Sequence, residues 1–397
     1  MITTINNKHK KLNVPNLRFP EFQGEWISKT IGDIAPLQRG FDLPTGKICN
    51  GKIPVVYSNG IMNHHSSYKC VAPGLVTGRS GTIGKFTYIE DGYYWPHNTS
   101  LWVTDFHDNN PKFIYYLYQT IHIEQYSTGS GVPTLNRNNV HRHKTFIPKL
   151  KEQNKIAAFL SLLDERIATQ NKIIEDLKKL KSAIVEKVFC SPNQEYPMCR
   201  IEGFEQALST YKMSDFSSRI ATKNKDSKCS LVLTIAAQYG LVNQESFFNK
   251  SVASENLTGY YLLHKGEFAY NRSYSAGYDW GTVKRLDNYD EGVLSTLYIC
   301  FKINETIVDS DYLAYYFESS KWHKGLSDIA GEGARNHGLL NVSMTDYFNT
   351  KHRFPVIEEQ KAIAKMLNTI AEKERKATLL GECYQKQKQY LLCQMFI

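Results

Sequence analysis

A stripe of apolar residues near the middle of the chain constrains the fold more than any other feature. Between Phe146 and Phe189 the apolar positions recur in steps that alternate between four and three residues: Ile156, Leu160, Leu163, Ile167, Ile174, Leu177, Ile184 and Val188. This spacing is the a/d seam of a coiled coil and predicts a long helix that meets a second helix along its length. Gln170 and Lys181 are the polar positions of the seam. We expect them to fix the register of the helices or to contact a further subunit.

The end of the chain repeats this stretch at a constant offset of 207 residues. The matching pairs are Pro148 and Pro355, Gln153 and Gln360, Ile156 and Ile363, Leu160 and Leu367, and Phe189 and Phe396. The second seam holds Ile363, Leu367, Ile370, Ala377, Tyr384, Leu391 and Met395. Gly381 lies inside it, and a helical glycine costs about 1 kcal/mol relative to alanine. We therefore expect the second helix to pack against the first. The alternative is two amphipathic helices on separate cores, which would not need so narrow a stripe.

The segments between the helices are rich in strand signals, and their order repeats as well. The first half has strand runs at 53–60, 74–89 and 99–103, a helix at 111–120 and a glycine-rich loop at 127–136. The second half has strand runs at 230–240, 266–286 and 295–301, a helix at 311–319 and a glycine-rich loop at 330–341. The pattern predicts an α+β fold in which two long helices separate two β-rich domains. The expected boundaries are a tail at 1–13, a domain at 14–148, a helix at 149–190, a linker and domain at 191–355, and a helix at 356–397.

Length and composition set broad limits on the kind of protein. A chain of 397 residues is too long for one ordinary core. Its net charge of +9 suits a polyanionic partner, but a basic protein without one is an equal reading. The eight cysteines form no CxxC pair, the first residues lack the apolar core of a signal peptide, and no apolar run approaches the length of a membrane span. We expect a cytoplasmic protein with reduced thiols.

Motifs for catalysis do not occur in the sequence. It has no Walker loop, no GxSxG, no HExxH, and neither the adenosylmethionine loop nor the Asn/Asp-Pro-Pro-aromatic run of an amino-methyltransferase. The histidine pairs His64/His65 and His141/His143 have no cysteine or carboxylate at ligand spacing, so solvated loop histidines are the better reading. We expect a binding protein with no catalytic residue and no metal site.

Candidate nucleic-acid contacts lie on turns and glycine-rich loops of both halves. The first half offers Arg79, Ser80, Thr82, Lys85, Ser130, Asn136 and Arg137. The second half offers Arg272, Ser273, Tyr274, Lys284, Arg335, Asn336 and His337. Arginine can donate two hydrogen bonds to guanine, asparagine can read adenine, and hydroxyl groups bind phosphate. Glycine lets a backbone approach a phosphodiester closely, although such loops are commonly only turns.

Several motifs together carry a family resemblance that covers essentially the whole chain. They are Pro-Asn-Leu-Arg-Phe-Pro at 15–20 with Trp26, Gly-Arg-Ser-Gly-Thr-Ile-Gly at 78–84, and Thr-Gly-Ser-Gly at 128–131. The helix-leading run from Ile147-Pro148 through Glu152-Gln153 to Ile167 is the most specific, and Pro355, Glu359-Gln360 and Ile363-Ala364 repeat it. The chain resembles the specificity subunit of a type I restriction-modification system. Its second glycine loop, at 331–335, departs from the usual Ser-Gly run.

The resemblance implies a division of labour. Each β-rich domain would be a target recognition domain that reads one half of a split site in double-stranded DNA. The helices would pack as an antiparallel pair, set the gap between half-sites and dock two modification subunits that methylate adenine. The residues expected to serve pairing and docking are Ile156, Leu160, Leu163, Ile167, Ile174, Leu177, Ile184, Ile363, Leu367, Ile370 and Leu391. S-adenosylmethionine, ATP and Mg²⁺ would belong to the modification subunits and to the DNA-translocating restriction subunits.

Helix length agrees with such a role, since about 40 residues at 1.5 Å per residue span about 60 Å, against about 34–36 Å for one DNA turn. Two other functions remain open from the residues alone. One is a stand-alone DNA-binding regulator with an intramolecular coiled coil. The other is the detached recognition half of a fused restriction-methylase, which would bind adenosylmethionine itself.

Overall fold

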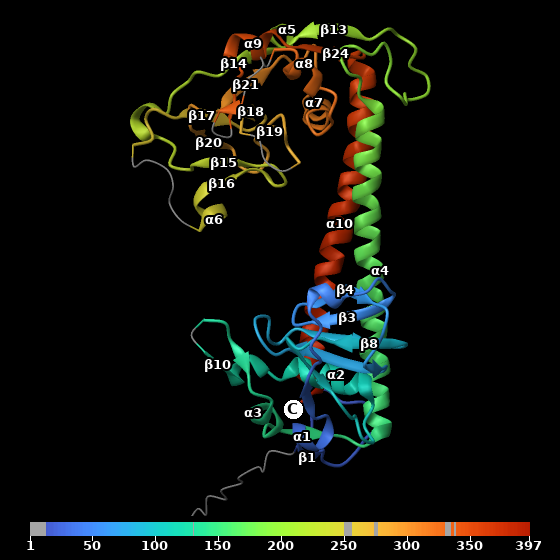
Figure 1. The fold of residues 1–397 in the computed structure, drawn as a ribbon. Coiled ribbons are helices and arrows are strands. Elements are labelled where there is room, and N and C mark those ends of the chain that lie inside the picture. The colour runs from blue at the N-terminus through green and yellow to red at the C-terminus, as the bar shows by residue number, and fades with distance from the viewer. Residues whose placement is uncertain (1–12, 130, 250–255, 274–276, 330–334, 337–338) are drawn as a thin grey trace, which may run out of the picture. The chain divides into compact units, whose positions relative to one another are not determined.

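The computed structural model describes residues 13–129, 131–249, 256–273, 277–329, 335–336 and 339–397. The chain forms two compact units (Figure 1). Unit 1 comprises Met1–Asn171 and Leu379–Ile397, and unit 2 comprises Lys172–Thr378. Each unit therefore contains a β-rich part and a portion of each long helix.

Unit 1 is built from two four-stranded sheets and a two-stranded ribbon. In the ribbon β1 (Ile27–Thr30) pairs with β12 (Lys144–Ile147). One sheet has the order β2 (Leu37–Arg39), β9 (Ser100–Val103), β6 (Gly74–Gly78), β7 (Phe86–Ile89). The other has the order β4 (Gly60–His65), β3 (Ile53–Tyr57), β8 (Tyr93–Pro96), β5 (Cys70–Val71). Shorter elements are α1 (Ile31–Ile34), η1 (Thr45–Lys47), α2 (Pro111–Thr120), η2 (Ile123–Tyr126), the hairpin β10 (Ser127–Thr128) and β11 (Thr134–Leu135), and α3 (Arg137–His141).

Unit 2 repeats this arrangement with different residues. Its ribbon pairs β13 (Ser209–Lys212) with β24 (Lys351–Phe354), and its four-stranded sheet has the order β14 (Ser217–Arg219), β21 (Ile299–Ile303), β18 (Phe268–Asn271), β19 (Thr282–Arg285). The second sheet of unit 1 is replaced by two separate pairs, β15 (Leu233–Ala236) with β16 (Gly240–Asn243) and β17 (Tyr261–His264) with β20 (Glu291–Leu294). The remaining elements are α5 (Met213–Phe216), η3 (Lys225–Ser227), α6 (Gln244–Phe248), α7 (Ser310–Tyr316), α8 (His323–Ser327), β22 (Arg335–Asn336), β23 (Leu339–Leu340) and α9 (Met344–Asn349).

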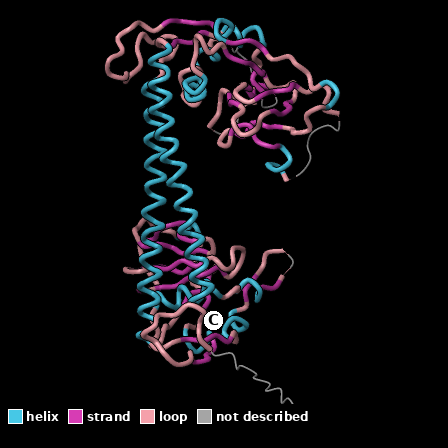
Figure 2. Tube along the Cα trace, turned by 180° about the vertical axis from the view of Figure 1, so that it is seen from behind, coloured by secondary structure: helices cyan, strands magenta, loops and turns pink. Residues whose placement is uncertain are grey.

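The two long helices are α4 (Leu150–Val188) and α10 (Ile357–Met395). Both have 39 residues, and each bound of α10 lies 207 residues after the corresponding bound of α4. In unit 1 the start of α4 shares a core with the end of α10, and in unit 2 the end of α4 shares a core with the start of α10 (Figure 2). The helices therefore run antiparallel. The predicted α+β fold class, with its internal repeat and paired helices, is confirmed.

The seam residues pack as the heptad spacing predicts. Ile156, Leu160, Ile167 and Leu391 are buried in unit 1, and Ile363 and Leu367 are buried in unit 2. Leu163, Ile174, Leu177, Ile184 and Ile370 are half-buried. Lys181 Nζ lies 3.8 Å from Glu374 Oε2, and Lys388 Nζ lies 2.6 Å from Asp164 Oδ1. Because Lys388 follows Lys181 by 207 residues, the repeat places one cross-helix ion pair in each unit, as expected of residues that fix register.

The glutamine of each helix-leading motif ties three segments together. Gln153 Nε2 donates to the carbonyl of Pro148 at 3.0 Å and to Asn109 Oδ1 at 2.9 Å, and its Oε1 accepts from the backbone N–H of Asn110 at 3.0 Å. Asn110 is the N-cap of α2. In unit 2 Gln360 Nε2 donates to the carbonyls of Pro355 and Ile307, and its Oε1 accepts from the N–H of Asp309, the N-cap of α7. One buried amide thus joins the end of the ribbon, the start of the long helix and the start of the helix packed beside it.

The glutamate before it holds a buried ion pair. Glu152 accepts from Arg18 Nε at 2.7 Å and Nη2 at 2.8 Å, and from Trp26 Nε1 at 3.2 Å. Glu359 accepts from Arg200 Nε at 2.9 Å and Nη2 at 2.7 Å. Both carboxylates are almost fully buried. The motif that carries the family resemblance is therefore, in this fold, an anchor for the start of each helix.

His352 makes the stability of unit 2 sensitive to acid. It is 2% exposed, and its two ring nitrogens meet Tyr316 Oη at 3.1 Å and Thr350 Oγ1 at 2.8 Å. Burial lowers the pKa of His352 from 6.5 to about 3. Below pH 6.5 this histidine binds a proton in the unfolded chain but not in the folded chain. Buried His352 therefore makes its full contribution to the free energy of unfolding above pH 6.5. This contribution should decline by about 1.4 kcal/mol per pH unit on the way down toward about pH 3.

We expect calorimetric melts of the unit 2 transition to shift downward across this window. His352→Phe should flatten the shift, because phenylalanine does not titrate. The 207-residue offset places Thr145 at the same point of unit 1, so unit 1 lacks a histidine at this position. An unchanged pH profile in the variant would contradict the assignment.

Candidate nucleic-acid interface

A groove of about 840 Å³ in unit 1 gathers three of the predicted contacts, Arg79, Asn136 and Arg137. Its walls come from the end of β2, the turn after β6, the hairpin β10–β11 and the start of α3. Its other lining residues are Gln38, Arg39, Gly40, Phe41, Asp42, Asn98, Leu101, Thr128, Thr134 and Leu135. The glycine-rich loop at 127–136 and the turn that carries Arg79 are far apart in the sequence, and both line this groove.

Backbone hydrogen bonds fix the turn that carries Arg79. The N–H groups of Arg79 and Ser80 both donate to the carbonyl of Thr99, at 2.9 and 3.3 Å. The carbonyl of Arg79 accepts from the N–H of Leu135 at 2.7 Å, which attaches the hairpin β10–β11 to the turn. A Cβ on Gly78 would overlap the carbonyl oxygen of Thr82, so the turn requires glycine there. These hydrogen bonds fix the backbone of the turn from which the Arg79 side chain extends.

The groove holds three guanidinium groups that its own residues do not neutralise. In the part of the chain that the structure describes, Arg39, Arg79 and Arg137 form no side-chain hydrogen bond or ion pair. Arg39 and Arg137 are exposed, and Arg79 is half-buried. The carboxylate of Asp42, which lines the same groove, accepts from Asn98 Nδ2. Forked donors with no internal partner suit phosphate oxygens and the acceptor edge of guanine.

The other predicted residues of unit 1 lie at or beyond the edge of this groove. Asn136 Oδ1 accepts from the N–H of Asn138 at 3.0 Å, so Asn136 is first of all the N-cap of α3. Lys85 Nζ donates to the carbonyl of Asn59 at 2.7 Å and ties β7 to the turn between β3 and β4. Ser80 is half-buried and Thr82 is exposed, and neither lines the groove. Ser130 lies outside the described residues.

Unit 2 places Arg272 where unit 1 places Arg79 but turns its side chain inward. The carbonyl of Arg272 accepts from the N–H of Leu340 at 3.0 Å, as that of Arg79 does from Leu135. Its guanidinium donates to the carbonyls of Val342 and Leu297, both at 3.2 Å. The arginine in this conformation therefore braces the loops around it.

The remaining predicted residues of unit 2 are only partly described. Ser273 is exposed, and its N–H donates to Asn271 Oδ1 at 2.9 Å. Arg335 and Asn336 form β22, which pairs with β23, and their side chains lie outside the described part of the chain. Tyr274 and His337 lie outside it altogether.

Lys284 lines a pocket of unit 2 that Arg272 does not line. The pocket has a volume of about 780 Å³ and is also lined by Lys178 and Lys181 of α4 and by Tyr278. Burial lowers the pKa of Lys284, an effect opposed by the nearby charge of Glu318.

Sequence reasoning missed several polar residues of the unit 1 groove. Gln38 and Arg39 end β2, and Asn98 precedes β9. In unit 2 the corresponding strand β14 ends at Arg219, whose Nη2 donates to Tyr261 Oη at 2.9 Å. The available signal was an arginine at the end of a short strand in both halves, at Arg39-Gly40 and Arg219-Ile220. It is weaker than a glycine-rich loop because its meaning depends on which strands pair.

No group of three His, Cys, Asp or Glu side chains among the described residues is arranged to hold a metal ion. None of the helices described has the length and apolar character to cross a membrane.

Comparison with known proteins finds a matching domain family in the first half of the chain. Residues 23–179 match the family described as the type I restriction modification DNA specificity domain. This segment of the chain is therefore similar to the specificity domain of type I restriction-modification systems. The matched segment covers the β-rich part of unit 1, including the groove, and most of α4.

Two curated specificity subunits are similar to parts of this chain. The type I restriction enzyme MjaVIII specificity subunit of Methanocaldococcus jannaschii is 24% identical over 62% of this chain and 60% of its own length. The type I restriction enzyme EcoprrI specificity subunit of Escherichia coli is 23% identical over 42% of each chain. The matches thus span about 60% and 42% of these relatives. The crystal structure of a type I S subunit from M. genitalium has the same fold, with a TM-score of 0.60 at 16% identity over 97% of this chain and 99% of that one.

Proposed function

We propose that the chain selects the DNA sequence on which a type I restriction-modification complex acts. The β-rich part of each unit reads one half of a bipartite site in double-stranded DNA. The helices α4 and α10 set the spacing between the half-sites and dock the methylation subunits. The observation that carries the proposal is the duplication: unit 2 repeats the ribbon, the central sheet and the helix anchor of the unit 1 segment that matches a DNA specificity domain.

The groove of unit 1 supports DNA contact by its chemistry. Its three unneutralised guanidinium groups and the amides of Gln38 and Asn98 can donate to phosphate oxygens and to base edges. The subunit contributes no catalytic residue in this proposal. S-adenosylmethionine, ATP and Mg²⁺ act on the methylation and restriction subunits, and the stand-alone regulator is not favoured by the family match.

Reconstitution with a methylation subunit tests the function. We expect the complex to place adenine methylation on one bipartite sequence, detected by sequencing the methylated bases of a plasmid or host genome. The chain without its partner should methylate nothing and bind DNA weakly. A reconstituted complex that leaves no sequence-specific methyl mark would refute the proposal.

The groove itself gives a sharper prediction. Arg79→Ala and Arg137→Ala should each weaken binding of the complex to its own target, because a good bidentate base contact is worth about 1–3 kcal/mol, or roughly 5- to 150-fold. Fluorescence anisotropy with a target duplex and a scrambled duplex measures the loss. Arg142→Ala is the matched control, since Arg142 is an exposed arginine that lies outside the groove. Equal affinities for all three variants and the parent would show that DNA binds elsewhere.

A further inference from the structure

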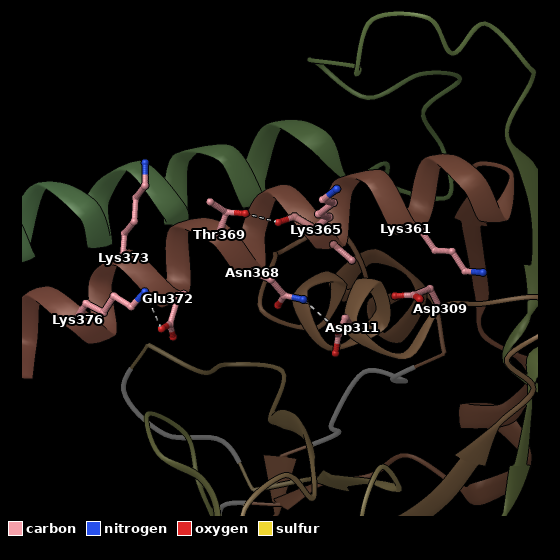
Figure 3. Close-up of a pocket in the computed structure, with 10 residues that line it drawn as sticks. Asp309, Asp311, Lys361, Lys365, Asn368, Thr369, Glu372, Lys373 and Lys376 are labelled. Atoms are coloured by element: carbon pink, nitrogen blue, oxygen red, sulfur yellow. Dashed lines mark hydrogen bonds and ion pairs between the residues drawn. The ribbon is translucent and has the colours of Figure 1, made fainter.

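The repeat allows the outer faces of the two long helices to be compared position by position. A groove of about 570 Å³ on the outer side of α10 in unit 2 is lined by Lys361, Lys365, Lys373 and Lys376 (Figure 3). We call these four residues the lysine face. The groove also reaches Asp309 and Asp311 at the start of α7, and Asn368, Thr369 and Glu372 of α10.

The acidic residues of this groove are already engaged. Glu372 Oε2 accepts from Arg375 Nε at 2.8 Å, and Glu372 Oε1 lies 3.4 Å from Lys376 Nζ. Asp311 pairs with Arg285 Nη1 at 2.8 Å and accepts from Asn368 Nδ2 at 2.8 Å. Asp309 Oδ1 caps α7 by accepting from the N–H of Tyr312.

Three lysines of the same face are not engaged. Lys361, Lys365 and Lys373 are exposed, and no hydrogen bond or ion pair of their ammonium groups occurs within the described residues. In Figure 3 Lys365 and Lys373 extend away from the carboxylates drawn. The lysine face therefore presents a surplus of positive charge to whatever covers it.

The corresponding face of α4 in unit 1 has a different character. At an offset of 207 residues, Lys361, Lys365, Lys373 and Lys376 are matched by Asn154, Ala158, Arg166 and Thr169. Thr369 is matched by Leu162, which is 65% exposed, and Phe159 beside it is 39% exposed. The helix anchors are the same in both units, whereas the four lysines of this outer face are matched in unit 1 by one arginine and three uncharged residues beside the exposed Leu162.

We propose that the lysine face docks an acidic segment of one methylation subunit, whereas a second copy packs on the matching face of α4 around Leu162, where fewer cations and more apolar surface are available. This inference rests on the proposed function for the identity of the partner. The two copies would then bind the same chain with unequal dependence on salt. Exposed ammonium groups without an internal partner, at Lys361, Lys365 and Lys373, are complementary to the carboxylates of an acidic protein segment.

Salt separates the two docking modes. Attraction between exposed charges is screened over about 8 Å at physiological ionic strength, while apolar burial is not weakened by salt. Native mass spectrometry or sedimentation of the reconstituted complex, from about 0.05 M to about 0.5 M salt, should show the loss of one methylation subunit before the other. The variant K361E/K365E/K373E should hold only one copy even at the low-salt end.

Matched variants make the test decisive. Lys172, Lys187 and Lys386 are exposed helix lysines outside the face, and K172E/K187E/K386E changes the net charge equally but should keep both copies. The neutral K361Q/K365Q/K373Q should give an intermediate loss, and circular dichroism checks that each variant is folded. Full assembly of K361E/K365E/K373E with unchanged salt dependence would overturn the inference and leave the proposed function standing.

Two other outcomes would also overturn it. Loss of DNA affinity with full assembly in K361E/K365E/K373E would assign the lysine face to phosphates. Equal loss of both copies would show that the two sites are equivalent. A parent chain that binds no methylation subunit under any condition would refute the inference and the proposed function together.

Discussion

Replacing residues 14–148 with the recognition domain of another specificity subunit is expected to change one half of the methylated sequence and to leave the other half as it was. The two units have separate apolar cores, so the strands and loops of unit 1 can be exchanged without altering those of unit 2. Each mismatched base pair costs about 1–3 kcal/mol, so a few changed contacts suffice to redirect the complex. Sequencing of methylated bases reads the outcome directly.

The reciprocal exchange provides the control. Replacing residues 191–355 should change the other half-site and preserve the first. The spacing between halves should stay constant in both exchanges, because α4 and α10 are untouched. If either exchange altered both halves together, the two units would not be independent readers.

Arg200→Ala should produce the largest loss of stability among single substitutions of a charged residue. Glu359 is 1% exposed, and Arg200 is the cation that meets both of its oxygens. Removing one partner of a buried ion pair leaves an uncompensated charge, which costs about 3–5 kcal/mol. Urea unfolding or calorimetry should show this loss in the transition of unit 2, together with weaker attachment of the start of α10.

Two other arginines calibrate the result. Arg18→Ala removes the equivalent cation from Glu152 but leaves the 3.2 Å bond from Trp26 Nε1, so a smaller loss is expected in unit 1. Arg375 meets Glu372 through the same two nitrogens on an exposed helix surface, and Arg375→Ala should leave the melting temperature nearly unchanged. Equal effects of Arg200→Ala and Arg375→Ala would mean that burial of the pair contributes nothing.

The long helices were predictable because the apolar spacing that specifies them is local and occurs twice in the sequence. A heptad spacing fixes both the element and the face it buries, and the 207-residue offset located the partner helix with almost the observed bounds. The helix at Pro111–Thr120 was equally clear, since Asn110 and Pro111 mark its start. The strands were located as runs, but their pairing into a central sheet of order β2-β9-β6-β7 depends on contacts between distant segments.

The candidate contacts were harder to predict because side-chain direction is not encoded locally. Arg79 and Arg272 both follow a strand and precede a turn, yet one lines an open groove and the other donates to two backbone carbonyls. Arg39 reaches the same groove only because β2 lies beside β9. The Glu-Gln motif is the reverse case: the sequence identified it as the most specific feature, and the structure explains it as an anchor.

The composition of unit 1 has a consequence for biosynthesis. Phe396 stacks on Phe113 with ring centroids 5.2 Å apart and meets the edge of Trp26 at 6.4 Å, and the N–H of Leu17 donates to the carbonyl of Gln394. The ribosome adds Gln394 and Phe396 only after it has made all of unit 2, which is one continuous segment. Unit 2 can therefore fold during translation while the earlier-made segment waits with Trp26 and Phe113 uncovered. A chain that terminates before Phe396 would lack these contacts, and Trp26 and Phe113 would keep a more exposed aromatic surface.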